Sequence, residues 1–186
     1  DVATEAAQMI PNLTFGVSSF DDYNYGSMGS GSDKPYRRHQ QQTTDLAAAQ
    51  SALNSLYASG GYDWPESTVE ALYQAAAGFG YNQGCYTSFE NNFSSEDDVP
   101  PFIAAPGDAF GGAVSGEYDP SVPGTGSLGG NGYRQGAVPI LVYTTDADVR
   151  NGFPPYNQGP KGGATPATGC SPDASPLFLN AALEDI

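Results

Sequence analysis

The 186-residue chain has little positive charge: 6 Lys and Arg residues stand against 21 Asp and Glu residues, for a formal net charge of −15. Nucleic-acid binding depends on basic side chains that displace counterions from phosphates, so we expect no nucleic-acid partner. The single histidine and the lack of a Cys-x-x-Cys pair argue against a structural zinc site. Because no stretch approaches the roughly 20 apolar residues of a membrane span, we expect no membrane insertion by this segment.

Signals for catalysis are also weak. The only histidine, His39, lies beside Arg37 and Arg38 in a polar run, a poor setting for the base of a hydrolytic triad. The segment 124–129 (GTGSLG) matches a dinucleotide-binding fingerprint, but the pattern predicts no strand before it and no helix after it. We therefore expect a protein that is not an enzyme.

The chain has only two cysteines, Cys85 and Cys170, and both lie in turn-rich stretches. An even number of cysteines in loops favours one disulfide and an oxidising compartment, so we expect an extracellular or cell-surface location. Two free thiols are the alternative. The strong acidity agrees with divalent-cation binding, and equally with simple solubility.

Hydrophobic residues make up 39% of the chain, enough for the core of one domain, while 24 Gly and 15 Pro indicate much irregular backbone. The apolar spacing predicts helices over 1–10, 45–59 and 66–77, and another that opens at 175 or 176. It predicts strands over 13–20 and 138–143, with loops over 21–42 and 86–135. For the helix over 45–59 we expect Thr44 as the N-cap.

Each of the two central helices has an expected buried face. In the helix over 45–59 it consists of Leu46, Leu53, Leu56 and Tyr57. In the helix over 66–77 it consists of Val69, Leu72, Tyr73 and Ala76. The first helix should bury Val2, Ala6, Met9 and Ile10 on one side.

The order of helices and strands predicts an α/β fold: an open, mostly parallel, doubly wound sheet in a single domain. The segment 138–143 (VPILVY) is almost uninterruptedly apolar, which is typical of a strand covered on both faces. Ligands of such sheets bind beyond the carboxyl ends of the strands. Asp146 follows the expected strand and is therefore well placed to hold a ligand.

Two short segments present carboxylates that a cation could use, 60–66 (GGYDWPE) and 144–148 (TTDAD). Mg²⁺ and Ca²⁺ take oxygen ligands and often retain water, so one or two carboxylates with hydroxyls can suffice. Structural roles are the alternatives: Asp63 as a helix cap, Glu66 as a favourable charge in a first helical turn, and Asp146 as a turn initiator.

Four features, in order along the chain, resemble the von Willebrand factor A domain, and most closely the I-like domain of integrin β subunits. Residues 13–22 (LTFGVSSFDD) resemble its second strand. Residues 60–78 (GGYDWPESTVEALYQAAAG) resemble its Asp-x-Pro-Glu motif and the helix after it. Residues 137–152 (AVPILVYTTDADVRNG) resemble its buried strand ending in Thr-Asp-Ala. Finally, Cys85 and Cys170 fall where the family has a disulfide.

The resemblance implies a metal-ion-dependent adhesion site for Mg²⁺ or Ca²⁺. Glu66 and Asp146 match its ligands, and Asp63 and the Pro65 carbonyl match part of a neighbouring Ca²⁺ site. On this resemblance Trp64 would stand beside the metal as a ligand-contact residue, with a packed loop aromatic as the alternative. Thr145 is a second expected ligand-contact residue. The partner would be a protein or surface ligand with an acidic group.

Two departures from the family pattern stand out. Gly61 replaces an Asn of the second cation site. The hallmark Asp-x-Ser-x-Ser of the first, central strand does not occur, so we expect an incomplete domain that lacks its first strand and its last strand and helix. A degenerate domain without metal is the alternative. An adhesion module is thus the leading prediction, and a metal-free structural scaffold the second.

Overall fold

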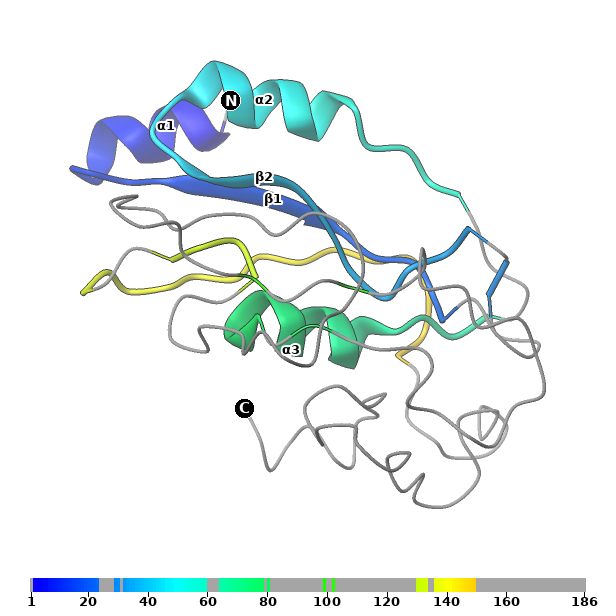
Figure 1. The fold of residues 1–186 in the computed structure, drawn as a ribbon. Helices are drawn as coiled ribbons and strands as arrows, with labels where there is room; N and C mark the ends of the chain where they lie inside the picture. The colour runs from blue at the N-terminus through cyan, green and yellow to red at the C-terminus, as the bar shows by residue number, and fades with distance from the viewer. Residues whose placement is uncertain are drawn as a thin grey trace.

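The computed structural model describes residues 2–23, 29–30, 32–59, 64–78, 80, 99, 102, 130–133 and 136–149. Within these residues the elements follow in a simple order (Figure 1): α1 (Val2–Met9), β1 (Phe15–Ser19), β2 (Arg37–Thr43), α2 (Leu46–Asn54) and α3 (Thr68–Ala77). Helices α1 and α3 and strand β1 confirm three predicted elements with boundaries shifted by one to two residues. None of the described helices is both long and apolar enough to cross a membrane.

The N-terminus of helix α2 is capped by Asp45, the residue before its first turn. The Asp45 carboxylate accepts hydrogen bonds from the backbone N–H groups of Ala47 and Ala48, at 2.9 and 3.1 Å. The prediction of Thr44 as N-cap is therefore wrong by one residue, and the helix ends at Asn54 instead of Ser59. A carboxylate also favours the positive end of the helix dipole, which explains why Asp45 takes this position.

The buried face of α2 differs from the predicted one. Ala49 is the buried residue of the helix, whereas Leu53, Leu56 and Tyr57 are exposed. Helix α2 lies over the small β1–β2 sheet, so only one narrow face of the helix contacts other residues. Met9 at the end of α1 is likewise 81% exposed, against the prediction.

Strands β1 and β2 form an antiparallel pair, with Phe15 opposite Thr43 and Ser19 opposite Arg37. The register shifts on either side of Val17, which is buried. The prediction of a loop over 21–42 is wrong from Arg37 onward. The β2 sequence RRHQQQT carries no apolar alternation, so the strand is defined by its pairing with β1 and not by its own pattern.

Helix α3 is the most buried element of the described chain. Val69 and Tyr73 are buried and pack with Ala77 and Val149. Their burial confirms the prediction for these two residues. Ala76 is exposed, against the prediction, while Gln74 is buried on another side of the helix. The helix ends at Gly78, whose φ of 70° is the left-handed conformation that glycine adopts without strain.

The segment 136–149 is extended along the sheet (yellow in Figure 1) but forms no regular strand. Val138, Ile140 and Val142 are 84, 68 and 92% exposed. The prediction of a buried strand over 138–143 is therefore wrong for the described structure. The physical reason is that no described element covers the side chains of 138–143. The bridge that the segment forms lies farther along, where Val149 pairs with Glu66 in parallel.

The doubly wound parallel sheet remains a prediction, since the described sheet has two strands. The predicted final helix lies outside the described residues. So does most of the predicted loop over 86–135.

Candidate functional site

Three segments meet where β1 ends, and we call this region the rim: residues 20–23, 65–68 and 145–149. The Ser67 hydroxyl donates a hydrogen bond to the Asp21 carbonyl at 2.6 Å. The Glu66 N–H donates to the Asp148 carbonyl at 2.8 Å. These two contacts tie the start of α3 to the end of β1 on one side and to the end of the apolar run on the other.

The rim brings together the two segments that carry the predicted cation ligands. Glu66 pairs by its backbone with a residue only two positions from Asp146. Glu66 is partly buried, and Asp146 and Thr145 are exposed. The Thr145 hydroxyl accepts the N–H of Ala147 at 3.2 Å, so the side chain of Thr145 closes a local turn around Asp146.

The other predicted site residues are placed as follows. Pro65 is buried, and Trp64 beside it is 62% exposed, so an indole contact surface is open to solvent. Asp63, Cys85 and Cys170 lie outside the described residues.

The donor set at the rim consists of oxygen atoms, which suits Mg²⁺ or Ca²⁺. In addition to the carboxylates, the Thr68 hydroxyl is buried and has no hydrogen-bond partner in the described part of the chain. A buried hydroxyl without a partner costs free energy, and an added ion or water could remove that cost. Among the described residues, however, no three of His, Cys, Asp and Glu gather closely enough to form a metal site.

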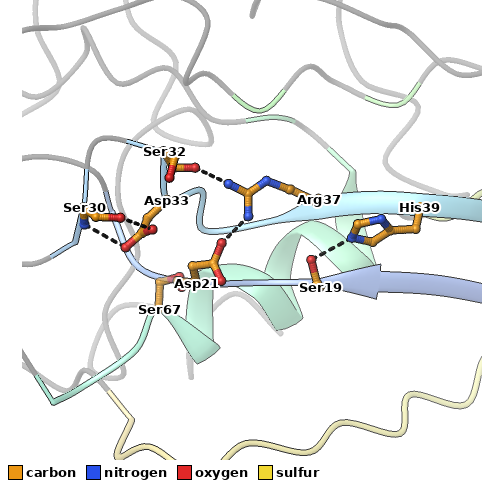
Figure 2. Close-up of polar contacts among 8 residues, drawn as sticks. All are labelled: Ser19, Asp21, Ser30, Ser32, Asp33, Arg37, His39 and Ser67. Atoms are coloured by element: carbon orange, nitrogen blue, oxygen red, sulfur yellow. Dashed lines mark hydrogen bonds and ion pairs between the residues drawn. The ribbon is translucent and has the colours of Figure 1, made fainter. Parts of the chain in front are cut away.

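The loop between β1 and β2 is held by charged and hydroxyl groups beside the rim (Figure 2). Arg37 forms an ion pair with Asp21 and also donates to the Ser32 carbonyl. The Asp33 carboxylate, almost fully buried, accepts from the Ser30 N–H at 2.7 Å and from the Ser30 hydroxyl at 2.5 Å. Arg37 thus holds the side chain of Asp21, the residue whose backbone carbonyl accepts the hydrogen bond from Ser67.

A second polar cluster lies inside the fold, under the rim. The Tyr23 hydroxyl donates to Glu70 Oε2 at 3.1 Å, and Gln74 Nε2 donates to Glu70 Oε1 at 2.8 Å. Gln74 also exchanges two hydrogen bonds with Gly80, both at 2.8 Å. Each of these three side chains is essentially inaccessible to solvent. We call Tyr23, Glu70, Gln74 and Gly80 the α3 junction.

Ser18, on β1, has its hydroxyl oxygen 2.9 Å from the Tyr36 hydroxyl and 2.8 Å from Asn131 Oδ1, and its single proton is shared between these two acceptors. Burial raises the pKa of Tyr36 far above its ordinary value, although the hydrogen bond from Ser18 and the nearby Arg38 act in the opposite direction. Tyr36 is therefore a neutral hydrogen-bond donor to Asn131 at physiological pH, and this contact joins 130–133 to the sheet.

His39 lies on β2, where its Nε2 is hydrogen bonded to the Ser19 hydroxyl at 2.7 Å (Figure 2). Partial burial and the charge of Arg37 lower the pKa of His39, and Asp21 raises it less. A serine beside a neutral imidazole is the pair that nucleophilic catalysis uses. The pair is exposed, however, and the carboxylate of Asp21 is engaged by Arg37, so we interpret the contact as a cross-strand hydrogen bond.

Sequence reasoning missed several residues of this region, namely Asp22, Asp33, Ser67 and Glu70. One signal was available: Asp21 and Asp22 follow a strand directly, the position at which ligands and turns are usual. No pattern in the sequence marks Glu70, because its burial depends on a contact with Tyr23, 47 positions away. The contact of Asp33 with Ser30 is local, but no role was predicted for either residue from the sequence.

Comparison of the chain with protein-family models, curated proteins and solved structures finds no match. The proposals below rest on the residues and their contacts, together with the resemblance of the motifs.

Proposed function

We propose that this protein is an extracellular adhesion module that binds an acidic group of a partner through Mg²⁺ or Ca²⁺ at the rim. The observation that carries the proposal is the hydrogen bond of 2.8 Å between the Glu66 N–H and the Asp148 carbonyl. Of the carboxylates that the sequence predicts as ligands, Glu66 and Asp146 come from segments that are joined by this bond.

The residues of the rim would have two roles, cation binding and contact with the partner. Glu66 and Asp146 would hold the cation, and Thr68 and Thr145 are hydroxyl-bearing residues of the same two segments. A bound divalent cation supplies a positive centre with a coordination position that an acidic partner group can fill. Two carboxylates and hydroxyls leave such a position open. The indole of Trp64, which is exposed, would contact that partner.

The fold prepares this site through its backbone. Ser67 anchors the start of α3 to the end of β1, and the ion pair of Arg37 with Asp21 keeps that end in place. A rigid scaffold lowers the entropic cost of ordering the ligands when the cation binds.

A metal-free surface scaffold is the second candidate. It is favoured by the lack of any group of three potential ligand side chains among the described residues and by the turn that Thr145 closes at Asp146. This candidate predicts the same stability in chelator and in divalent cation.

Thermal unfolding in EDTA, in Mg²⁺ and in Ca²⁺ separates the two candidates. A cation present at about 100 times its Kd should stabilise the folded state by about 2.7 kcal/mol, which raises Tm by several degrees. Asp146→Ala should abolish this rise. The matched control is Asp45→Asn, which keeps a capping residue on α2 and should leave the rise unchanged. A Tm that does not respond to either cation in the unaltered protein would contradict the proposal.

A further inference from the structure

The turn between α1 and β1 carries a sequence pattern that the proposed function does not use. Residues 12–14 (NLT) match Asn-x-Ser/Thr, in which the middle residue is any residue except proline. This pattern is the acceptor for N-linked glycans on the surface loops of secreted proteins. The chain contains one further match, at 92–94, which lies outside the described residues.

The backbone places Asn12 on the surface of the fold. The residue is exposed, and so is every residue from 8 to 11. Its φ of 61° lies in the left-handed region, which asparagine adopts in turns more readily than most residues. The turn follows α1 and precedes Phe15, the first residue of β1, so Asn12 belongs to neither element. A group attached to its side chain would therefore disturb neither the helix nor the strand.

The surface beside Asn12 is apolar. Met9 is 81% exposed and Ile10 is 47% exposed, and the two are adjacent in the chain. Because Met9 precedes Asn12 by three residues, their Cα atoms are at most about 11 Å apart. A glycan is bulky and strongly hydrated, so one on Asn12 would cover these two side chains with polar surface. The left-handed turn by itself accounts for an asparagine, and the uncovered apolar pair is a second observation that favours a glycan.

The turn lies at the opposite end of β1 from the rim (Figure 1). Asn12 precedes the strand, whereas the rim begins at Phe20, directly after the strand. A strand of 5 residues spans about 16 Å, at about 3.3 Å per residue. A glycan on the turn would thus be attached well away from Glu66 and Asp146, and cation binding and glycosylation are compatible.

We propose that Asn12 carries an N-linked glycan, which covers Met9 and Ile10 at the end of β1 away from the rim. The donor is an oligosaccharide linked to a polyisoprenyl diphosphate, in the secretory pathway. A bond forms between Asn12 Nδ2 and the anomeric carbon of the first sugar, and the bond from that carbon to the diphosphate oxygen breaks. The lipid diphosphate leaves with the electron pair, and Nδ2 loses one proton. This inference rests on the extracellular location in the proposed function and not on the cation.

The test directs the full chain into the secretory pathway of cultured animal cells by means of a cleavable signal peptide. Ser94→Ala removes the second acceptor pattern, at 92–94. Peptide mass mapping of the chain, from medium and cells alike, should find a glycan on Asn12. Peptide N-glycosidase should release this glycan and leave a carboxylic acid in place of the amide. A chain without glycan at Asn12 would overturn the proposal, and the dependence of Tm on Mg²⁺ or Ca²⁺ would still decide the proposed function independently.

Thr14→Ala and Thr14→Ser are matched variants, because they alter the same position and only serine keeps the acceptor pattern. Neither changes Asn12, so the left-handed turn keeps its asparagine. The alanine variant should lose the glycan and the serine variant should retain it. A glycan on Asn12 in the alanine variant would contradict the proposed acceptor.

The covering of the apolar pair has a readout of its own. Hydrogen peroxide oxidises exposed methionine to the sulfoxide, and Met9 is exposed in the bare chain. Oxidation of Met9 should be severalfold slower in the glycosylated chain than in the same chain after enzymatic release of the glycan. Equal rates of oxidation would overturn the covering of Met9 and Ile10.

Discussion

The α3 junction and the apolar run at 138–143 flank the same rim, yet they bury opposite kinds of side chain. The junction encloses a carboxylate, a tyrosine hydroxyl and a carboxamide, and Glu70 has no accessible surface. The run places valine and isoleucine in solvent. In most folded chains the two kinds of residue would be found in the reverse positions.

The difference shows what each region requires. Polar groups are buried at low cost when their hydrogen-bonding capacity is satisfied, and Glu70 accepts from both Tyr23 and Gln74. The junction is therefore complete within the described chain. Apolar side chains need a covering surface, and the described chain does not supply one to the run. This contrast explains why substitutions in α3 should affect stability more than substitutions in the run.

The largest effect should come from removing the carboxylate of the junction. Glu70→Ala removes the carboxylate that accepts from the Tyr23 hydroxyl and from one N–H of Gln74, while the bonds of Gln74 to Gly80 remain. We expect a loss on the order of 3 kcal/mol in the free energy of unfolding. Asp148→Ala removes an exposed carboxylate from the other region and should change stability by less than about 0.5 kcal/mol. Urea unfolding monitored by circular dichroism measures both. Equal losses would show that the two regions do not differ in the way described.

A smaller effect is expected from one identical change made in helix α3, beside the junction, and in the run. Val69→Ala removes two methyl groups from the contact with Tyr73 and Val149, and should cost about 2 kcal/mol from lost burial and the residual cavity. Val142→Ala removes the same groups from a side chain that is 92% exposed and should cost less than about 0.5 kcal/mol. A comparable cost at Val142 in the isolated chain would mean that the run is covered in solution.

The sequence allowed most of the regular elements of the fold to be predicted, for reasons that are local. The apolar spacing of 66–77 and the glycine after it determine α3, and the alternation in 13–20 determines β1. Strand β2 could not be predicted, because its polar residues gain their conformation from pairing with β1. The exposure of 138–143 could not be predicted either, and the prediction of a buried strand there is wrong. An apolar run shows what kind of surface should cover it, but not whether that surface is present.

In the candidate site, too, the locally encoded features could be predicted and the tertiary contacts could not. The motif around Glu66 and the end of the apolar run pointed to one rim, and the structure joins these two segments through Asp148. The residues that support the rim could not be predicted from the sequence. The ion pair of Arg37 with Asp21 links residues 16 positions apart, and the hydrogen bond of Tyr23 with Glu70 spans 47 positions. Contacts of this kind follow from the tertiary fold and leave no local pattern.

The smallest expected effect is a change in the pKa of His39, which tests the pairing of β1 with β2. Partial burial and the charge of Arg37 should hold the pKa of His39 below its ordinary value of 6.5. Since the folded state favours the neutral imidazole, its contribution to stability is complete above about pH 6.5 and is lost as the pH falls through the lowered pKa. NMR titration of the ring protons should show the lowered pKa. Arg37→Gln should raise it, whereas Arg38→Gln, on the neighbouring residue, should leave it in place. A titration in which both variants match the unaltered protein would mean that Arg37 does not act on the ring, and that the pairing of β1 with β2 differs from the one described.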